Sequence, residues 1–280
     1  MDHAQYFNQS SLQAANLRLH YLSQLLREQT GSIVQYGILR GFTVSYSHWA
    51  EVAAGAYLLG TYEVGVCAIL DEIRSPQKVL VDLGAADGIF GIGLVSTNAF
   101  ARSLCFEMDE QRRQVIEQRS AELGLSGRVA VYGKADRNLP EILSASGGNP
   151  AERVVLCDIE GAEFELFDEA MLEKLSDGHV IIEIHDFLLS DPEQAAHAFD
   201  ELHQRASKFF HVYEIRDGLR DIRNIPLLRH WSDWDAWLIC VEARYRMMRW
   251  LWLEPKTHPR RADTDVDCLI LDYQRRIFAA

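Results

Sequence analysis

The chain has 280 residues, of which 48% are hydrophobic, and its 28 basic and 41 acidic residues give a formal net charge of −13. This length and apolar content suffice for one large domain, or for one domain with an extension. The acidic balance argues against a nucleic-acid partner, because such proteins gain affinity by neutralising phosphates with clustered Lys and Arg.

From the sequence we expect no leader, no membrane span and no disulfide framework. Residues 1–5 lack a charged and then apolar pattern, and no apolar run approaches the ~20 residues that cross a bilayer. The five cysteines are an odd number without metal-ligand spacing, so we expect them to be reduced. These features predict a cytoplasmic protein without a transmembrane segment.

Residues 1–76 are expected to form a helical N-terminal extension that partly covers the cofactor. A leucine stripe over residues 12–26 predicts an amphipathic helix, and a β-like segment follows at 32–46. A second helical stretch is predicted over 49–73. Glu63, within this stretch, is either a solvated helix residue or a residue with the role that the family resemblance below implies.

A buried strand, a tight turn and a helix follow over residues 79–93. Such a unit binds nucleotides, but a dinucleotide fingerprint needs glycines where this turn has Gly84, Ala86 and Ile89. A phosphate-binding loop needs a lysine, and none occurs between Lys78 and Lys134. A nicotinamide oxidoreductase is therefore disfavoured.

Asp82, two positions before Gly84, indicates another ligand. Its carboxylate would repel a pyrophosphate, whereas it suits a ligand that brings an ammonium and a sulfonium to the turn. S-adenosylmethionine is such a ligand. The cofactor-binding residues predicted here are Asp82, Gly84, Ala85, Ala86, Asp87 and Gly88.

After the turn, strands and helices alternate as in a doubly wound sheet. The expected fold is α/β and Rossmann-like, with a mostly parallel seven-stranded sheet and helices on both faces. The later strands are predicted at 102–107, 128–132, 153–158, 179–185, 209–215 and 236–242.

Acidic residues end several of these strands, and ligands of open α/β sheets bind outside the strands' carboxyl ends. Glu107, 23 positions after Gly84 (107 − 84), is placed to accept hydrogen bonds from a ribose diol. Met108 would lie against the adenine face. Asp136 would accept from the adenine amino group, or would cap the helix expected at 137–143.

The fourth strand ends in Asp158, and Glu160 follows two positions later. Close acids repel, so this pair indicates a cationic or proton-bearing ligand. Glu183 and His185 share one face of the fifth strand, with His185 at its mouth.

These segments, in this order, resemble the motifs of the FkbM-type methyltransferases over roughly residues 60–187. The motifs are Gly60-Thr61-Tyr62-Glu63, Val81-Asp82-Leu83-Gly84-Ala85, Phe106-Glu107, Asp158-Ile159-Glu160-Gly161-Ala162-Glu163 and Glu183-Ile184-His185. The chain departs from the family at Ala86, where the family usually has Asn.

The resemblance implies an enzyme that transfers a methyl group from S-adenosylmethionine to oxygen and releases S-adenosylhomocysteine. The acceptor is typically a hydroxyl of a sugar or natural product, here a small sugar, polyketide or lipid-linked molecule. The resemblance also implies cofactor roles for Glu63, Asp82, Gly84, Glu107 and Asp158. The alternative is a non-catalytic S-adenosylmethionine-binding or scaffolding protein.

The candidate catalytic residues are His185, Glu160 and Asp158. His185 is the preferred base, because an imidazole with a pKa of ~6.5 accepts a proton at neutral pH, and Glu183 or Asp186 could orient it. His185 could instead only hydrogen-bond the neighbouring turn. A further alternative, not favoured, is Mg²⁺ held by Asp158, Glu160 and His185.

The chain thus divides into the extension, a cofactor-binding domain at 77–254 and a tail at 255–280. Tryptophans and arginines alternate over 231–252 and are expected to pack around the seventh strand; a sugar-stacking or membrane-surface face is the alternative. Residues 220–234 are a candidate substrate lid. Residues 269–278 are expected to dock back on the protein or to mediate formation of a homo-oligomer.

Overall fold

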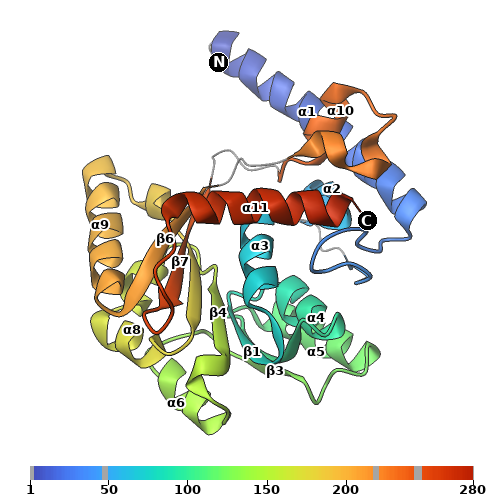
Figure 1. The fold of residues 1–280 in the computed structure, drawn as a ribbon. Coiled ribbons are helices and arrows are strands. Elements are labelled where there is room, and N and C mark those ends of the chain that lie inside the picture. The colour runs from blue at the N-terminus through green and yellow to red at the C-terminus, as the bar shows by residue number, and fades with distance from the viewer. Residues whose placement is uncertain (1–2, 46–49, 217–220, 243–247, 280) are drawn as a thin grey trace. The chain divides into compact units, whose positions relative to one another are not determined.

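The computed structural model describes residues 3–45, 50–216, 221–242 and 248–279 (Figure 1). The chain forms two compact units. One contains the sheet and is built from residues 69–217 and 248–268; the other is helical and combines residues 1–68, 218–247 and 269–280.

A seven-stranded sheet forms the centre of the first unit, with the strand order β3-β2-β1-β4-β5-β7-β6 (Figure 1). Strands β1 to β5 pair in parallel, and β7 runs antiparallel to both β5 and β6. The predicted Rossmann-like, mostly parallel sheet is therefore confirmed. The strands are β1 Ser75–Leu83, β2 Phe100–Phe106, β3 Val129–Tyr132, β4 Arg153–Cys157, β5 His179–Glu183, β6 Phe210–Arg216 and β7 Arg249–Pro255.

The predicted position of the seventh strand is wrong. Residues 233–239 form helix α10 (Asp233–Ile239), whose first turn is capped by the Ser232 hydroxyl. Ala236, Ile239 and Cys240 are buried at the i, i+3, i+4 spacing of a helix. The seventh strand is instead β7, where six successive residues, 250–255, are buried on both faces of the sheet.

Helices cover both faces of the sheet. On one face, alternate strand residues such as Val81 and Val155 pack into a core with α6, α8 and α9. On the other face, Gly91 of α4 lies so close to β2 that a methyl group there would be 2.3 Å from Cys105 Sγ. These helices are α4 Ile89–Ser96, α5 Glu110–Glu122, α6 Leu139–Ala145, α7 Glu163–Leu166, α8 Glu169–Leu175 and α9 Pro192–Phe209.

The helical unit contains α1 (His3–Thr30), α2 (Ala50–Leu59), the start of α3 (Val64–Ile73), α10 and the end of α11 (Asp263–Phe278). The predicted first helix is confirmed, whereas the single helix expected over 49–73 is broken into α2 and α3. Gly60 lies between them at φ +66°. A methyl group on Gly60 would lie 2.1 Å from the Tyr36 carbonyl oxygen, so this position requires glycine.

Two further expectations concern the segment 32–46 and the C-terminal residues. Within the described part of the β-like segment 32–46, the only pairing is an isolated bridge between Ile33 and Thr43. The C-terminal residues do dock back, because Phe278 is buried in the same core as Leu19 and Leu22 of α1.

No helix of the described residues is long and apolar enough to cross a membrane.

The Trp/Arg-rich segment divides between the two units. Trp250 and Trp252 are buried, but they lie within β7 itself, whereas the expectation was that they pack around a strand at 236–242. Trp234 and Trp237 of α10 are 70% and 58% exposed. Arg244, Arg246 and part of the candidate lid lie outside the described residues.

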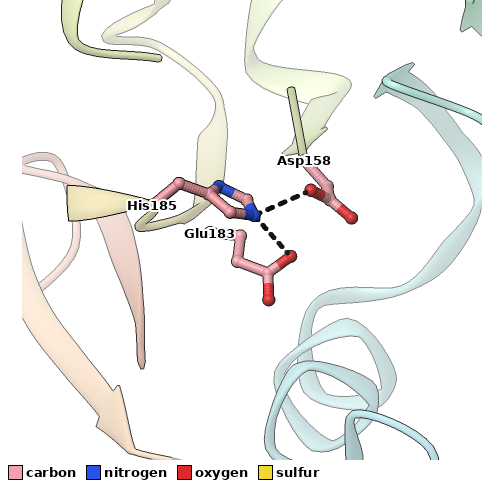
Figure 2. Close-up of side chains that lie close together, drawn as sticks. All are labelled: Asp158, Glu183 and His185. Atoms are coloured by element: carbon pink, nitrogen blue, oxygen red, sulfur yellow. Dashed lines mark ion pairs between the residues drawn. The ribbon is translucent and has the colours of Figure 1, made fainter. Parts of the chain in front are cut away.

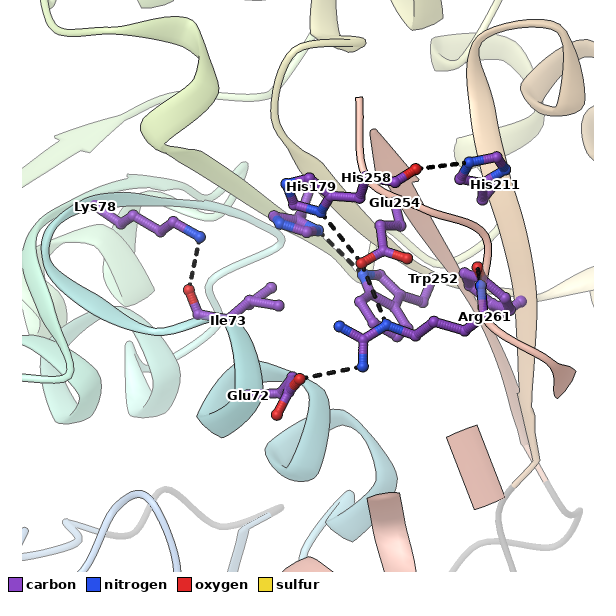
Figure 3. A network of polar contacts seen from close by, with 10 residues as sticks. Glu72, Ile73, Lys78, His179, His211, Trp252, Glu254, His258 and Arg261 are labelled. Atoms are coloured by element: carbon purple, nitrogen blue, oxygen red, sulfur yellow. Dashed lines mark hydrogen bonds and ion pairs between the residues drawn. The ribbon is translucent and has the colours of Figure 1, made fainter. Parts of the chain in front are cut away.

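A polar network around the buried His179 and Glu254 lies at the amino ends of β1 and β5 (Figure 3). This edge of the sheet is opposite the carboxyl ends of the parallel strands. His179 is 3% exposed, and its Nδ1 accepts a hydrogen bond of 3.3 Å from Trp252 Nε1. Glu254 Oε1 contacts His258 Nδ1 at 3.2 Å and Arg261 Nε at 3.4 Å. The network therefore ties residues after β7 to the sheet.

Candidate functional site

The turn between β1 and α4 has a backbone that only small residues allow. Gly84, Ala86 and Gly88 have φ angles of +84°, +49° and +79°. A methyl group on Gly84 would lie 1.7 Å from the carbonyl oxygen of Asp158, so the turn touches the residue that follows β4. Ala86 is not a glycine, so its positive φ carries strain.

Glu107 connects the end of β2 to this turn. Its Oε2 accepts a hydrogen bond of 2.8 Å from the Ala86 N–H, and its Oε1 accepts one of 2.8 Å from the Asp109 N–H. The side chain is buried, and the two bonds fix both carboxylate oxygens beside the turn. This is the position that the sequence predicts for a ribose ligand.

The two adenine-contact candidates lie at the ends of neighbouring strands. Met108 follows Glu107 and is 74% exposed, so its thioether is accessible. Asp136 lies after β3 and accepts a hydrogen bond of 2.8 Å from the Asn138 N–H. Asn138, and not Asp136, is the N-cap position of α6. Their contacts with adenine stay predictions.

Asp82 is buried close to the end of β1. Burial, with smaller contributions from Asp158 and Glu107, raises its pKa to about 7, although the Gly91 N–H opposes the shift. Asp82, Glu107 and Asp158 therefore create a negative field in a buried region beside the turn. A cationic ligand would relieve this repulsion.

A second cluster surrounds His185, directly after β5 (Figure 2). Its Nε2 lies 3.5 Å from Asp158 Oδ1, 3.5 Å from Glu160 Oε2 and 3.7 Å from Glu183 Oε2. The side chains of His185 and Glu183 are 3% and 2% exposed, whereas those of Asp158 and Glu160 are 37% and 76% exposed. The structure thus brings the three candidate catalytic residues together and adds Glu183.

Glu163 holds this cluster in place, a role that the sequence analysis missed. The fully buried carboxylate accepts hydrogen bonds from the His185 N–H, at 2.7 Å, and from the Gly161 N–H, at 2.8 Å. Its Oε1 also lies 3.5 Å from His185 Nδ1. Asp186, expected to orient His185, instead forms an ion pair with Arg249.

The carboxylates around His185 determine its charge. Burial alone would lower its pKa, but Glu163, Asp158 and Glu160 together outweigh burial and raise it. The imidazole therefore retains a proton to higher pH than an isolated histidine does. Such a group is a weaker candidate for a neutral base at physiological pH.

Glu63 belongs to the helical unit. It lies at φ +45° between α2 and α3, with a buried side chain, and its N–H donates a hydrogen bond of 2.8 Å to Glu242 Oε1. Its role as a cofactor ligand stays a prediction.

Among known proteins, the matches to this chain are solved structures. No protein-family model matches the chain, and no curated protein matches it. The O-methyltransferase TomG from Streptomyces achromogenes, involved in tomaymycin synthesis and solved with S-adenosylmethionine, has a TM-score of 0.47 and 12% identity, covering 75% of this chain and 92% of its own.

Two further structures are similar at the same level. An O-methyltransferase from Bacillus cereus in complex with S-adenosylhomocysteine has a TM-score of 0.45 and 12% identity, covering 85% of this chain and 91% of its own. A putative precorrin-6Y C5,15-methyltransferase domain from Corynebacterium diphtheriae has a TM-score of 0.41 and 17% identity, covering 71% and 98%. Because the sequence identities and TM-scores are this low, the function of the chain has to be argued from the residues of the site itself.

Proposed function

We propose that the chain is an S-adenosylmethionine-dependent methyltransferase that acts on a hydroxyl of a sugar or another small natural product. The observation that supports this proposal most strongly is the convergence of Asp82, Glu107 and Asp158 on the Gly84 turn. Two of these carboxylates, Asp82 and Glu107, are buried, and such a cluster favours a ligand that carries an ammonium and a sulfonium. Glu107 supplies acceptors for a ribose diol, and Met108 and Asp136 extend the site toward the adenine.

In this reaction the bond between sulfur and the methyl carbon breaks and a bond between that carbon and the acceptor oxygen forms. The sulfonium becomes the neutral thioether of S-adenosylhomocysteine, and the hydroxyl loses its proton. In-line positioning supplies much of the acceleration. Gly84 of the turn contacts the backbone of Asp158, and Asp158 belongs to the cluster with His185 and Glu160. We therefore place the acceptor at this cluster, beside the turn.

Calorimetric titration with S-adenosylmethionine and S-adenosylhomocysteine tests the cofactor site. We expect wild-type protein to bind both, and Asp82→Asn and Glu107→Gln to bind about tenfold more weakly or worse, since each loses a charge-assisted contact. Glu117→Gln, which changes an exposed carboxylate of α5, is the matched control. Binding of NAD with higher affinity than either compound would contradict the proposal.

Methyl transfer is tested separately with cofactor labelled in its methyl group and a panel of hydroxyl compounds. Transfer to oxygen is the expected result. Cofactor binding without transfer to any member of the panel would favour the non-catalytic alternative.

A further inference from the structure

We infer that Asp158, Glu183 and His185 form a binding site for a divalent cation at the carboxyl ends of β4 and β5. The role of this cation in catalysis rests on the proposed function, whereas its binding does not. The sequence analysis placed Glu160 in such a set and did not favour it. The structure places the nearly buried Glu183 in that position.

The spacing of the ligand atoms supports the site. One carboxylate oxygen from each acid and the Nε2 of His185 all lie within 4.8 Å of one another. The two separations from Nε2, 3.5 and 3.7 Å, are long for hydrogen bonds. Adjacent ligands bound at about 2.1 Å from one octahedral ion lie roughly 3 Å apart, slightly closer than these groups are now. The groups thus need little movement to bind an ion.

The orientation of His185 is an independent indication. A histidine that binds a metal through one ring nitrogen usually donates its other N–H to a carboxylate, which fixes the tautomer and the ring. Glu163 lies on this side of the ring, with Oε1 3.5 Å from Nδ1, and its Oε1 accepts a hydrogen bond from the His185 backbone N–H. The Nδ1 side of the ring therefore faces Glu163, and Nε2 faces Asp158 and Glu183 (Figure 2).

The donor set limits the kind of ion. Imidazole favours transition metals, and carboxylates favour harder ions such as Mg²⁺ and Mn²⁺. One imidazole and two carboxylates suit a divalent ion between these classes, such as Mn²⁺. Three protein ligands leave positions for water and for the acceptor hydroxyl.

The cation gives the cluster a defined part in the proposed reaction. A hydroxyl bound to a divalent ion is more acidic, so its proton leaves more readily. Glu160, whose side chain is 76% exposed and whose Oε2 lies 3.5 Å from His185 Nε2, can accept that proton and pass it to water. With such an ion bound, the oxygen would take the methyl carbon from sulfur, which leaves as the neutral thioether of S-adenosylhomocysteine. His185 serves as a ligand here and not as the base.

Titration of chelator-treated full-length protein with MnCl₂, without cofactor or acceptor, tests the inference. Loss of the electron paramagnetic resonance signal of free Mn²⁺ measures binding directly. We expect one ion per chain for the wild type and at least a tenfold weaker affinity for His185→Ala and Glu183→Gln. Glu163→Gln should weaken binding about 10- to 100-fold while leaving all three ligands in place. The control is His203→Ala, an exposed imidazole of α9.

The outcomes distinguish this inference from the proposed function. Wild-type protein that binds no Mn²⁺ at millimolar concentration overturns the cation site, whether or not the variants fold. Unchanged affinity in folded His185→Ala and Glu183→Gln proteins does the same. If S-adenosylmethionine binds and Mn²⁺ does not, the methyltransferase proposal stands with His185 as base. If Mn²⁺ binds and S-adenosylmethionine does not, the cation site stands and the proposed function fails.

Discussion

Asp82 links cofactor affinity to pH. Its pKa of about 7 means that the free protein holds a proton there below neutrality, whereas a sulfonium and an ammonium would favour the charged carboxylate. We expect the dissociation constant of S-adenosylmethionine to be about tenfold higher near pH 6 than near pH 8. We also expect Asp82 to release a proton to the buffer when the cofactor binds. Calorimetry in buffers of different ionisation enthalpy measures both. Asp82→Asn should remove the dependence, and a wild-type affinity that is constant over this range would contradict the assignment.

His179 links stability to pH in the acid range. Burial, followed by Lys78, His258 and Arg261, lowers its pKa from 6.5 to about 3 (Figure 3). His179 is therefore protonated below about pH 6.5 in the unfolded chain, but only below about pH 3 in the folded protein. The stability of the fold is unaffected by this group above pH 6.5 and falls as the pH drops below it.

We expect this group to account for a loss on the order of 3 kcal/mol in unfolding free energy between about pH 6.5 and pH 4. Urea unfolding across this range should show a shallower acid slope for His179→Phe than for the wild type. His203→Phe, on the surface of α9, should keep the wild-type slope. Equal slopes for all three proteins would show that His179 is not the cause.

At the level of single residues, the sequence predicts acids at strand ends well, because chain order and the strand pattern place them at one edge of the sheet. Glu107 is an example. Glu163 was missed because its partner, the His185 N–H, is 22 positions away and lies after β5, whereas Glu163 begins helix α7. No local pattern carries that contact.

Among the elements, the β1-turn-α4 unit has the strictest steric requirement. A side chain on Gly84 would collide with the backbone of Asp158 and would need a φ of +84°. We expect Gly84→Ala to lower the unfolding free energy by ~2–4 kcal/mol and to abolish cofactor binding. Gly127→Ala is the matched control, because no atom lies within 4 Å of a methyl group there. Denaturant unfolding and calorimetry on both variants make the comparison.

The same level explains the error at residues 236–242. An apolar run of this length is compatible with a strand or with a buried helix face, and periodicity alone does not separate them. The Ser232 cap and the acidic residues of the first turn, Asp233 and Asp235, favour the helix. These capping signals were present in the sequence and outweigh the apolar run.

For the whole molecule, the sequence predicts the class of fold but not the composition of the helical unit. Periodic strands and helices indicate an α/β sheet, whereas contacts such as that between the Tyr273 hydroxyl and the Ile38 N–H join residues 235 positions apart. No feature of the sequence specifies this pairing. The predicted extension, residues 1–76, is therefore joined by later segments that were assigned elsewhere.

The C-terminal helix should contribute measurably to this unit. Phe278 is buried and meets the Tyr36 ring edge-to-face at 5.4 Å. We expect Phe278→Ala to lower the unfolding free energy by ~3 kcal/mol or more. Leu12→Ala, which truncates a residue of α1 that is 43% exposed, should change it by no more than ~0.5 kcal/mol. Similar values for the two variants in urea unfolding would contradict the docking of α11.

The central claim is that the Gly84 turn binds S-adenosylmethionine, and a crystal structure of the protein with S-adenosylhomocysteine tests it most directly. The predicted result places the ribose hydroxyls within hydrogen-bonding distance of the Glu107 carboxylate and the amino acid part of the ligand against the turn at 84–88. A nucleoside bound elsewhere on the chain, or bound here without contacting Glu107, would contradict the assignment.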